Sequence, residues 1–128
     1  MTAWTPDDLA AFGGSDEVRI TSLRPDGTAR KPVPIWIVRL GDQLYVRSAY
    51  GPENGWYRRA RAAGVGRIAV RGRERDVAFE DADPSVAAAL HAAYHAKYDR
   101  YGERIVGTVV SPEAAAATLR VLPRLASR

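Results

Sequence analysis

The densest group of residues that could do chemistry lies mid-chain, in the stretch SAYGPENGWYRRARAAGVGRI (48–68). Its glycine-containing loop leads into an expected helix over 55–63, and free N–H groups at a helix N-terminus favour an anion. Several side chains of the strand–loop–helix segment 43–61 could add hydrogen bonds or aromatic contacts: Arg47, Ser48, Trp56, Tyr57, Arg58 and Arg59. The pattern predicts a site for a phosphorylated ligand, and an ordinary turn into a solvated helix remains the alternative.

A second basic group, Arg30 and Lys31, precedes the expected strand 31–40. Gly41 and Asp42 are typical of a tight hairpin between this strand and the next one, 43–49. If the two strands pair along their length, the start of the first lies beside the end of the second. We therefore expect the basic groups at 30, 31 and 47 to converge at one end of the sheet.

Histidines and tyrosines share an expected long helix over 84–101. His91 and His95 have the i, i+4 spacing of a metal-binding pair, but Ala92 stands where a zinc protease motif has glutamate. We expect no metal site. Tyrosines recur at helical spacing at positions 94, 98 and 101, a pattern that more often indicates packing than catalysis. No nucleophile elbow, Walker loop or dinucleotide fingerprint occurs.

The remaining elements must position these residues. A helix capped by Thr5 ends at Gly13, a turn with Pro-Asp-Gly chemistry occupies 24–28, and a short helix begins near Ser111. The other expected strands are 17–23, 66–72, 74–82 and 118–125. The sequence therefore predicts an α+β fold, a mainly antiparallel six-stranded β-barrel with inserted helices, in a single domain over residues 1–128.

Composition narrows the function classes. The chain has 128 residues, no cysteine, a net charge of +4 and a pI of about 9.8, and 19 basic residues that include only two lysines. Disulfides and thiolate metal sites are excluded. No apolar run is long enough for a membrane span, and we expect a cytoplasmic protein without a membrane partner. The central arginines indicate an anionic ligand, with nucleic acid as a second option.

Three consecutive motifs carry a family resemblance: GTARKPVPIW, then GDQLYVRS, then GPENGWYRRARAAGVGRIAV. Together they resemble the flavin- and deazaflavin-binding split β-barrel proteins, the pyridoxamine-phosphate-oxidase-like group. The third motif is similar to the glycine-containing loop and Trp-Tyr helix of deazaflavin-dependent nitroreductases. Over nearly its whole length the chain resembles an uncharacterised bacterial domain-of-unknown-function family assigned to that superfamily.

The resemblance implies a split barrel and a set of cofactor-binding residues. Basic groups would approach the phosphate or acidic tail, strand residues would line the ring edge, and the Trp-Tyr helix would border the phosphate. In that order, these residues are Arg30 and Lys31, then Val46, Arg47, Ser48 and Ala49, then Trp56, Tyr57 and Arg59. The resemblance also implies a homodimer with the cofactor at its interface.

We therefore expect a flavin- or deazaflavin-binding oxidoreductase that acts on a small conjugated organic substrate. Coenzyme F420 is favoured over flavin mononucleotide (FMN) because of the Trp-Tyr helix. Tyr50, Tyr94 and Tyr98 are the candidate catalytic proton donors. One alternative is a cofactor-free small-molecule-binding or biosynthetic protein on the same barrel, and another is a nucleic-acid-associated basic module.

Overall fold

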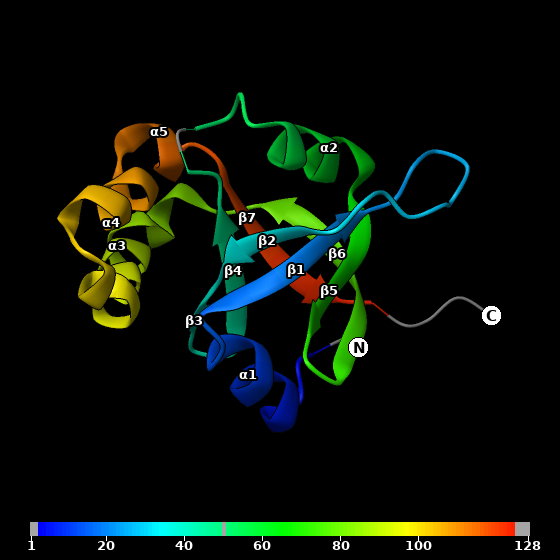
Figure 1. Ribbon diagram of the computed structural model, residues 1–128, viewed down its shortest axis with the longest axis horizontal. Helices are drawn as coiled ribbons and strands as arrows, with labels where there is room; N and C mark the ends of the chain where they lie inside the picture. Colours follow the sequence, from blue (N-terminus) through cyan, green and yellow to red (C-terminus); the bar gives the residue numbers. More distant parts are fainter. Residues whose placement is uncertain (1–2, 50, 125–128) are drawn as a thin grey trace.

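The computed structural model describes residues 3–49 and 51–124, which form an α+β fold built on one antiparallel sheet. Its strands follow the order β2-β1-β5-β6-β7-β4-β3. The strands are β1 (Glu17–Ser22), β2 (Val33–Trp36), β3 (Val38–Leu40), β4 (Gln43–Arg47), β5 (Val65–Val70), β6 (Arg73–Asp81) and β7 (Thr118–Pro123). The two ends of the sheet, β2 and β3, are nearly continuous in the chain, so the sheet curls into an almost closed barrel (Figure 1).

The predicted strand 31–40 is wrong as a single element, and its division accounts for seven strands in place of the expected six. β2 pairs with β1, with Ile35 opposite Val18, whereas β3 pairs with β4, with Val38 opposite Tyr45. Ile37 lies between the two strands and is fully buried. Only the last three residues of the expected strand take part in the Gly41–Asp42 hairpin.

Helices follow from capping residues where those are present. The Thr5 side chain accepts a hydrogen bond from the backbone N–H of Asp8 at 3.1 Å, and Gly64 ends the second helix at φ 73°, as the sequence predicts. The helices are α1 (Pro6–Gly13), α2 (Gly55–Ala63), α3 (Ala87–Tyr98), α4 (Glu103–Val110) and α5 (Pro112–Ala115), with 3-10 turns η1 (Pro84–Val86) and η2 (Asp99–Tyr101). None of the helices in the described ranges is long and apolar enough to cross a membrane.

The long helix expected over 84–101 is divided between η1, α3 and η2. No element is predicted for the segment of α4, whose sequence ERIVGTVV is rich in β-branched residues that favour strands. Packing overrides this preference: Val106 and Val109 are buried in the same apolar cluster as Leu90 and Tyr94 of α3. Tertiary contacts therefore determine this helix more than its local sequence does.

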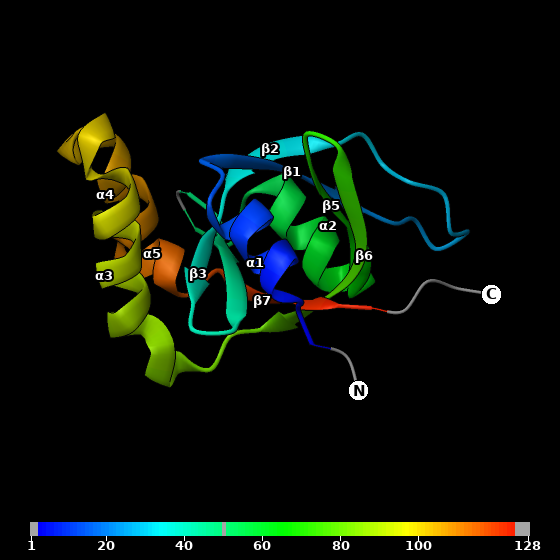
Figure 2. The same cartoon turned by 90° about the horizontal axis from the view of Figure 1, so that it is seen from below.

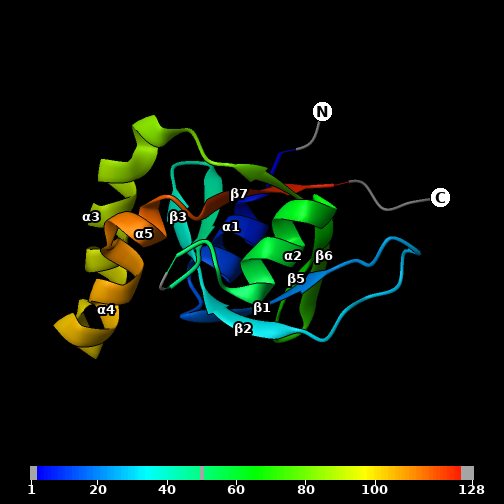
Figure 3. The same ribbon diagram turned by 90° about the horizontal axis from the view of Figure 1, so that it is seen from above.

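Two apolar cores hold these elements together. The larger core fills the barrel, and α1 and α2 close it at opposite ends (Figures 1 and 3). The smaller core lies between α3 and α4 and the outer side of β3 and β4, so these helices pack beside the barrel (Figure 2). The loop between β1 and β2 extends away from the barrel on the side opposite to α3. In this arrangement, the β1–β2 loop, the sheet, and helices α3 and α5 border the space next to α2.

Candidate cofactor and substrate cavity

An open cavity of about 1780 Å³ occupies that space. Its wall includes residues of α2, of the β1–β2 loop, of β6, and of the α3–α5 side. Six basic side chains line it, against two acidic ones, Asp81 and Asp83: the six are Arg24, Arg30, Arg47, Arg58, Arg59 and Arg61. The excess of arginine makes the cavity electropositive and suits it to an anionic ligand.

The N-terminus of α2 forms one wall of this cavity. Asn54 is at the N-cap but its side chain makes no capping hydrogen bond, and the first turn holds no acidic residue. A Cβ added at Gly55 would lie 2.8 Å from Nη1 of Arg59, so the guanidinium folds closely over this first turn. The positive charge of Arg59 and the positive end of the helix dipole therefore lie together at the cavity wall.

Arg30 faces the same region from the β1–β2 loop. It lines the main cavity and also a small adjoining pocket, which Lys31, Trp56 and Arg59 line as well. Its Nε is buried and has no hydrogen-bond acceptor among the residues that the structure describes. A buried N–H without an acceptor is costly, and a phosphate oxygen would satisfy it. The residues at this wall therefore fit a phosphate group.

Arg47 lies on the opposite side, where β4 meets α3 and α5. Its side chain is only 3% exposed, yet it lines the cavity. The guanidinium donates to Thr118 Oγ1 at 3.0 Å, to the Val109 carbonyl at 3.0 Å and to the Ala87 carbonyl at 3.4 Å, and it contacts His91 Nδ1 at 3.2 Å. Burial lowers the pKa of Arg47. No carboxylate pairs with it in the described part of the chain.

His91 is fixed by this contact. Because Arg47 can only donate, Nδ1 must be the acceptor, which assigns the neutral tautomer protonated on Nε2. Burial and the Arg47 charge lower the pKa of His91. His95 instead contacts Asp99 at 2.7 Å, so the two histidines have different partners. Within the described ranges, no group of three or more potential ligands could hold a metal ion.

The structure brings together four of the predicted cofactor-binding residues and sets the others apart. Arg30, Arg47, Tyr57 and Arg59 all line the main cavity. The convergence of Arg30 with Arg47 does not arise from the expected pairing of 31–40 with 43–49, because β2 pairs with β1. Two other predicted positions do not line the main cavity but do line the small adjoining pocket: Lys31 and Trp56.

The predicted ring-edge residues occupy less accessible positions. Val46 is fully buried in the barrel core, and Ala49 packs against the smaller core. Ser48 is also fully buried, and its hydroxyl donates to the Gly51 carbonyl at 2.6 Å, which shapes the loop that leads to α2. None of these three side chains lines the cavity.

The candidate catalytic tyrosines are likewise placed away from the cavity. Tyr94 and Tyr98 are fully buried in the smaller core, and burial raises the pKa of each phenol. The Tyr98 hydroxyl accepts a hydrogen bond from the Ile37 backbone N–H. Tyr50 lies outside the described residues. Tyr57, expected only as a cofactor contact, presents a buried phenol to the cavity, and its pKa is raised by burial and by the Asp81 charge.

Several central arginines are engaged in ion pairs rather than in a continuous basic face. Arg61 contacts Asp81 at 2.8 Å and Arg67 contacts Asp76 at 3.2 Å. Arg73 and Arg75 both reach the buried carboxylate of Asp8, at 2.7 and 3.1 Å. These pairs reduce the positive charge on β5 and β6, and they weaken the case for a nucleic-acid-binding surface.

Solved structures with the same fold are similar to the chain over nearly its full length. They include a protein titled F420 Reductase (TM-score 0.56, 17% identity, 93% of this chain and 93% of that chain). A FAD-binding protein from Mesorhizobium loti has a TM-score of 0.62, 17% identity, and coverage of 98% of this chain and 93% of that one. A putative pyridoxamine 5′-phosphate oxidase from Listeria innocua has a TM-score of 0.57 and 14% identity, with coverage of 91% of this chain and 88% of that one. These likenesses confirm the expected split-barrel fold.

No protein with a curated description has a significant sequence match to the chain. A family described as "Uncharacterized protein conserved in bacteria", DUF2255, matches residues 8–121. The match covers both walls of the cavity, from the β1–β2 loop to α5. The chain therefore belongs to the DUF2255 family.

Proposed function

We propose that this protein binds a flavin-type cofactor in the cavity and acts as an oxidoreductase on a small conjugated organic substrate. The observation that carries the proposal is the Nε of Arg30, which is buried and has no acceptor among the described residues, beside an α2 N-terminus that lacks a side-chain cap. Solved structures with this fold are titled as F420- or FAD-related proteins, which supports the same class of ligand.

In this proposal the α2 wall binds the phosphate of the cofactor. Arg30 and Arg59 donate charge-assisted hydrogen bonds, and Gly55 allows the phosphate to approach the first turn of the helix. Coenzyme F420 is favoured over FMN because of the resemblance of the Trp-Tyr helix to that of deazaflavin-dependent nitroreductases. A bound cofactor of either kind would supply hydride transfer, and the protein supplies its orientation and the electrostatic environment.

A proton donor is the second requirement of such a reaction. Tyr57 lines the cavity and its raised pKa keeps the phenol protonated at neutral pH, so it can donate a hydrogen bond or a proton to the substrate. Tyr50 remains a candidate from the sequence. Tyr94 and Tyr98 would need to leave the smaller core to take this role. We further propose that the protein is a cytoplasmic homodimer.

A binding screen tests the cofactor assignment. Purified protein is titrated with FMN, FAD and F420 and followed by absorbance, fluorescence and thermal shift. Arg30→Ala and Arg59→Ala should each weaken binding by about 1–3 kcal/mol, as expected for a lost charge-assisted hydrogen bond.

Arg71→Ala is the matched control, because Arg71 is exposed on the β5–β6 turn and does not line the cavity. It should leave the affinity unchanged. If none of the three compounds binds, the proposal fails and the cofactor-free alternative takes its place. An equal loss in all three variants would attribute binding to overall charge and would contradict the proposed phosphate site.

A further inference from the structure

We propose that Arg47 binds the carboxylate of an apolar carboxylic acid at the α3 side of the cavity. This acid is a different group from the cofactor phosphate, which the α2 wall would hold. That this acid is the substrate rests on the proposed function. The binding of the acid to Arg47 does not, because it can be measured without any cofactor.

The first argument is charge. Arg47 is a nearly fully buried cation, and all the partners it has in the described part of the chain are neutral. A buried charge without a counter-ion is costly, and neutral acceptors compensate it only partly. Since the side chain lines the cavity, an anionic ligand can provide the missing charge.

The second argument is the count of donors. A guanidinium has five N–H groups. Four of them have acceptors: Nε donates to Thr118, Nη1 to His91 and Val109, and Nη2 to the Ala87 carbonyl at 3.4 Å. One N–H of Nη2 is left without an acceptor among the described residues, and the other N–H of Nη2 makes the longest of the four contacts, with the Ala87 carbonyl. One free N–H, together with the positive charge, suits a single oxygen of a carboxylate, whereas a phosphate dianion calls for more donors than Arg47 has left.

The third argument is the surroundings of Arg47. The neighbouring wall of the cavity is mostly apolar and comes from η1, α3 and the end of α5: Val86, Ala87, Leu90, Ala115 and Ala116. Asp83, the N-cap of η1, also lines the cavity. The apolar side chains give an apolar body a contact surface, while Arg47 fixes its charged end. His91 acts as a positioning residue, because its Nδ1 accepts from Nη1 and leaves Nη2 for the ligand.

Benzoate and its neutral counterpart benzamide are the probes. Each is titrated into the cofactor-free wild-type protein and followed by ¹H–¹⁵N NMR. Benzoate should bind saturably, with a dissociation constant on the order of 1 mM, and about 10-fold or more tightly than benzamide. The shifted signals should belong to the α3 side, at Ala87, Leu90 and Thr118. No saturable binding, equal binding of both probes, or shifts confined to α2 would overturn the inference.

Arg47→Gln should reduce the benzoate affinity about 10-fold or more and leave that of benzamide unchanged. Arg58→Gln is the matched control, since it removes the same charge from an exposed arginine of the same cavity. An equal loss of benzoate affinity in both variants would show that the overall positive charge of the cavity binds benzoate. It would overturn the assignment of Arg47 as the binding residue. If Arg47→Gln does not fold, the inference is tested by comparing the affinities of the wild-type protein for benzoate and benzamide. Because no flavin is present, failure here is distinct from failure of cofactor binding.

Discussion

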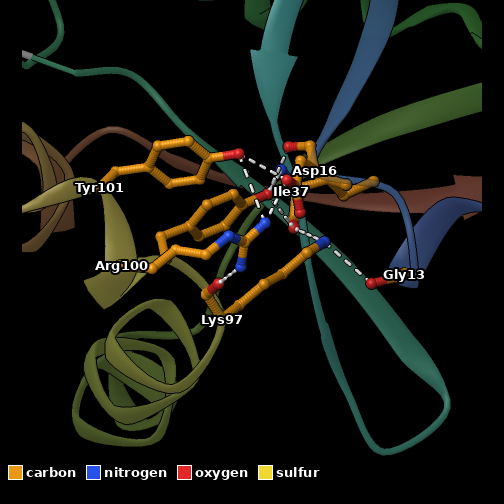
Figure 4. A network of polar contacts seen from close by, with 7 residues as sticks. Gly13, Asp16, Ile37, Lys97, Arg100 and Tyr101 are labelled. Carbon is orange, nitrogen blue, oxygen red and sulfur yellow. Dashed lines mark hydrogen bonds and ion pairs between the residues drawn. The ribbon is translucent and has the colours of Figure 1, made fainter.

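Lys97 is one of only two lysines in the chain, and it is partly buried where α3 meets the barrel. Its Nζ donates to the Gly13 carbonyl at 2.8 Å and to the Ile37 carbonyl at 2.7 Å, as Figure 4 shows. The ammonium also lies 5.2 Å from the centre of the Tyr98 ring. Burial lowers the pKa of Lys97 from its ordinary value of 10.5 to about 8.

This shift predicts a pH dependence of stability. Between about pH 8 and 10.5 the unfolded chain holds a proton on Lys97 that the native protein has released. The contribution of this group to the free energy of unfolding therefore rises with pH across that window. Urea denaturation at a series of pH values should show that Lys97→Met lacks this rise relative to the wild type.

Lys31→Met provides the control, because it removes the other, exposed lysine and should keep the wild-type slope. In protein labelled with ¹⁵N-lysine, one of the two side-chain signals should titrate near pH 8. Parallel stability curves for wild type and Lys97→Met would show that the lysine is not perturbed in this way.

At the scale of elements, two glycines in helices have opposite requirements. Gly64 ends α2 at φ 73°, whereas Gly107 lies inside α4 without a positive φ. A Cβ would meet no atom within 4 Å at either position, so only the backbone distinguishes them. Gly64→Ala should lower the free energy of unfolding by about 1–2 kcal/mol, and Gly107→Ala should raise it by about 0.5–1 kcal/mol. Equal effects, measured by urea denaturation, would contradict the assignment of the α2 cap.

The attachment of α3 to the barrel depends on the Tyr98 hydroxyl. It accepts from the Ile37 N–H at 3.0 Å and donates to the Asp16 carbonyl at 2.6 Å. Asp16 also forms an ion pair with Arg100 (Figure 4). This hydroxyl satisfies backbone groups where the chain passes from β2 to β3. Tyr98→Phe leaves the buried Ile37 N–H without its partner and should destabilise the protein by about 1–3 kcal/mol.

Tyr94→Phe is the matched comparison. The Tyr94 phenol is buried and has no partner among the described residues, so its removal should change the free energy of unfolding by less than about 0.5 kcal/mol or raise it. Urea denaturation compares the two variants directly. A large loss in Tyr94→Phe would contradict the assignment of Tyr94 as a buried phenol without a partner among the described residues.

For the whole molecule, the size of the cavity bears on the oligomeric state. Its volume of about 1780 Å³ in one chain exceeds the ~300–1,000 Å³ of typical ligand pockets. A groove that a second chain completes would have this property. Sedimentation equilibrium should therefore give twice the 14.0 kDa of one chain. A mass of one chain, with and without FMN, would contradict the proposed homodimer.

Much of the fold could be predicted because its signals are local. Thr5 and Gly64 predict the ends of α1 and α2, Gly41 and Asp42 predict the β3–β4 hairpin, and the strand patterns predict an antiparallel barrel. The basic loop and helix at 48–63 could be recognised as the wall of a cavity for the same reason. Glycine, capping residues and strand alternation act over a few positions, so a single sequence is sufficient to read them.

The tertiary structure alone decided the rest. The sequence by itself determined the fold class, the helix caps and the basic α2 wall, because these depend on neighbouring residues. It did not determine the break at Ile37, the helical state of α4 or the direction of Arg47. Those depend on contacts between residues far apart in the chain, such as Tyr98 with Ile37 and Arg47 with Val109. Such contacts form only when the barrel has closed and α3 has packed against it, so no local pattern encodes them.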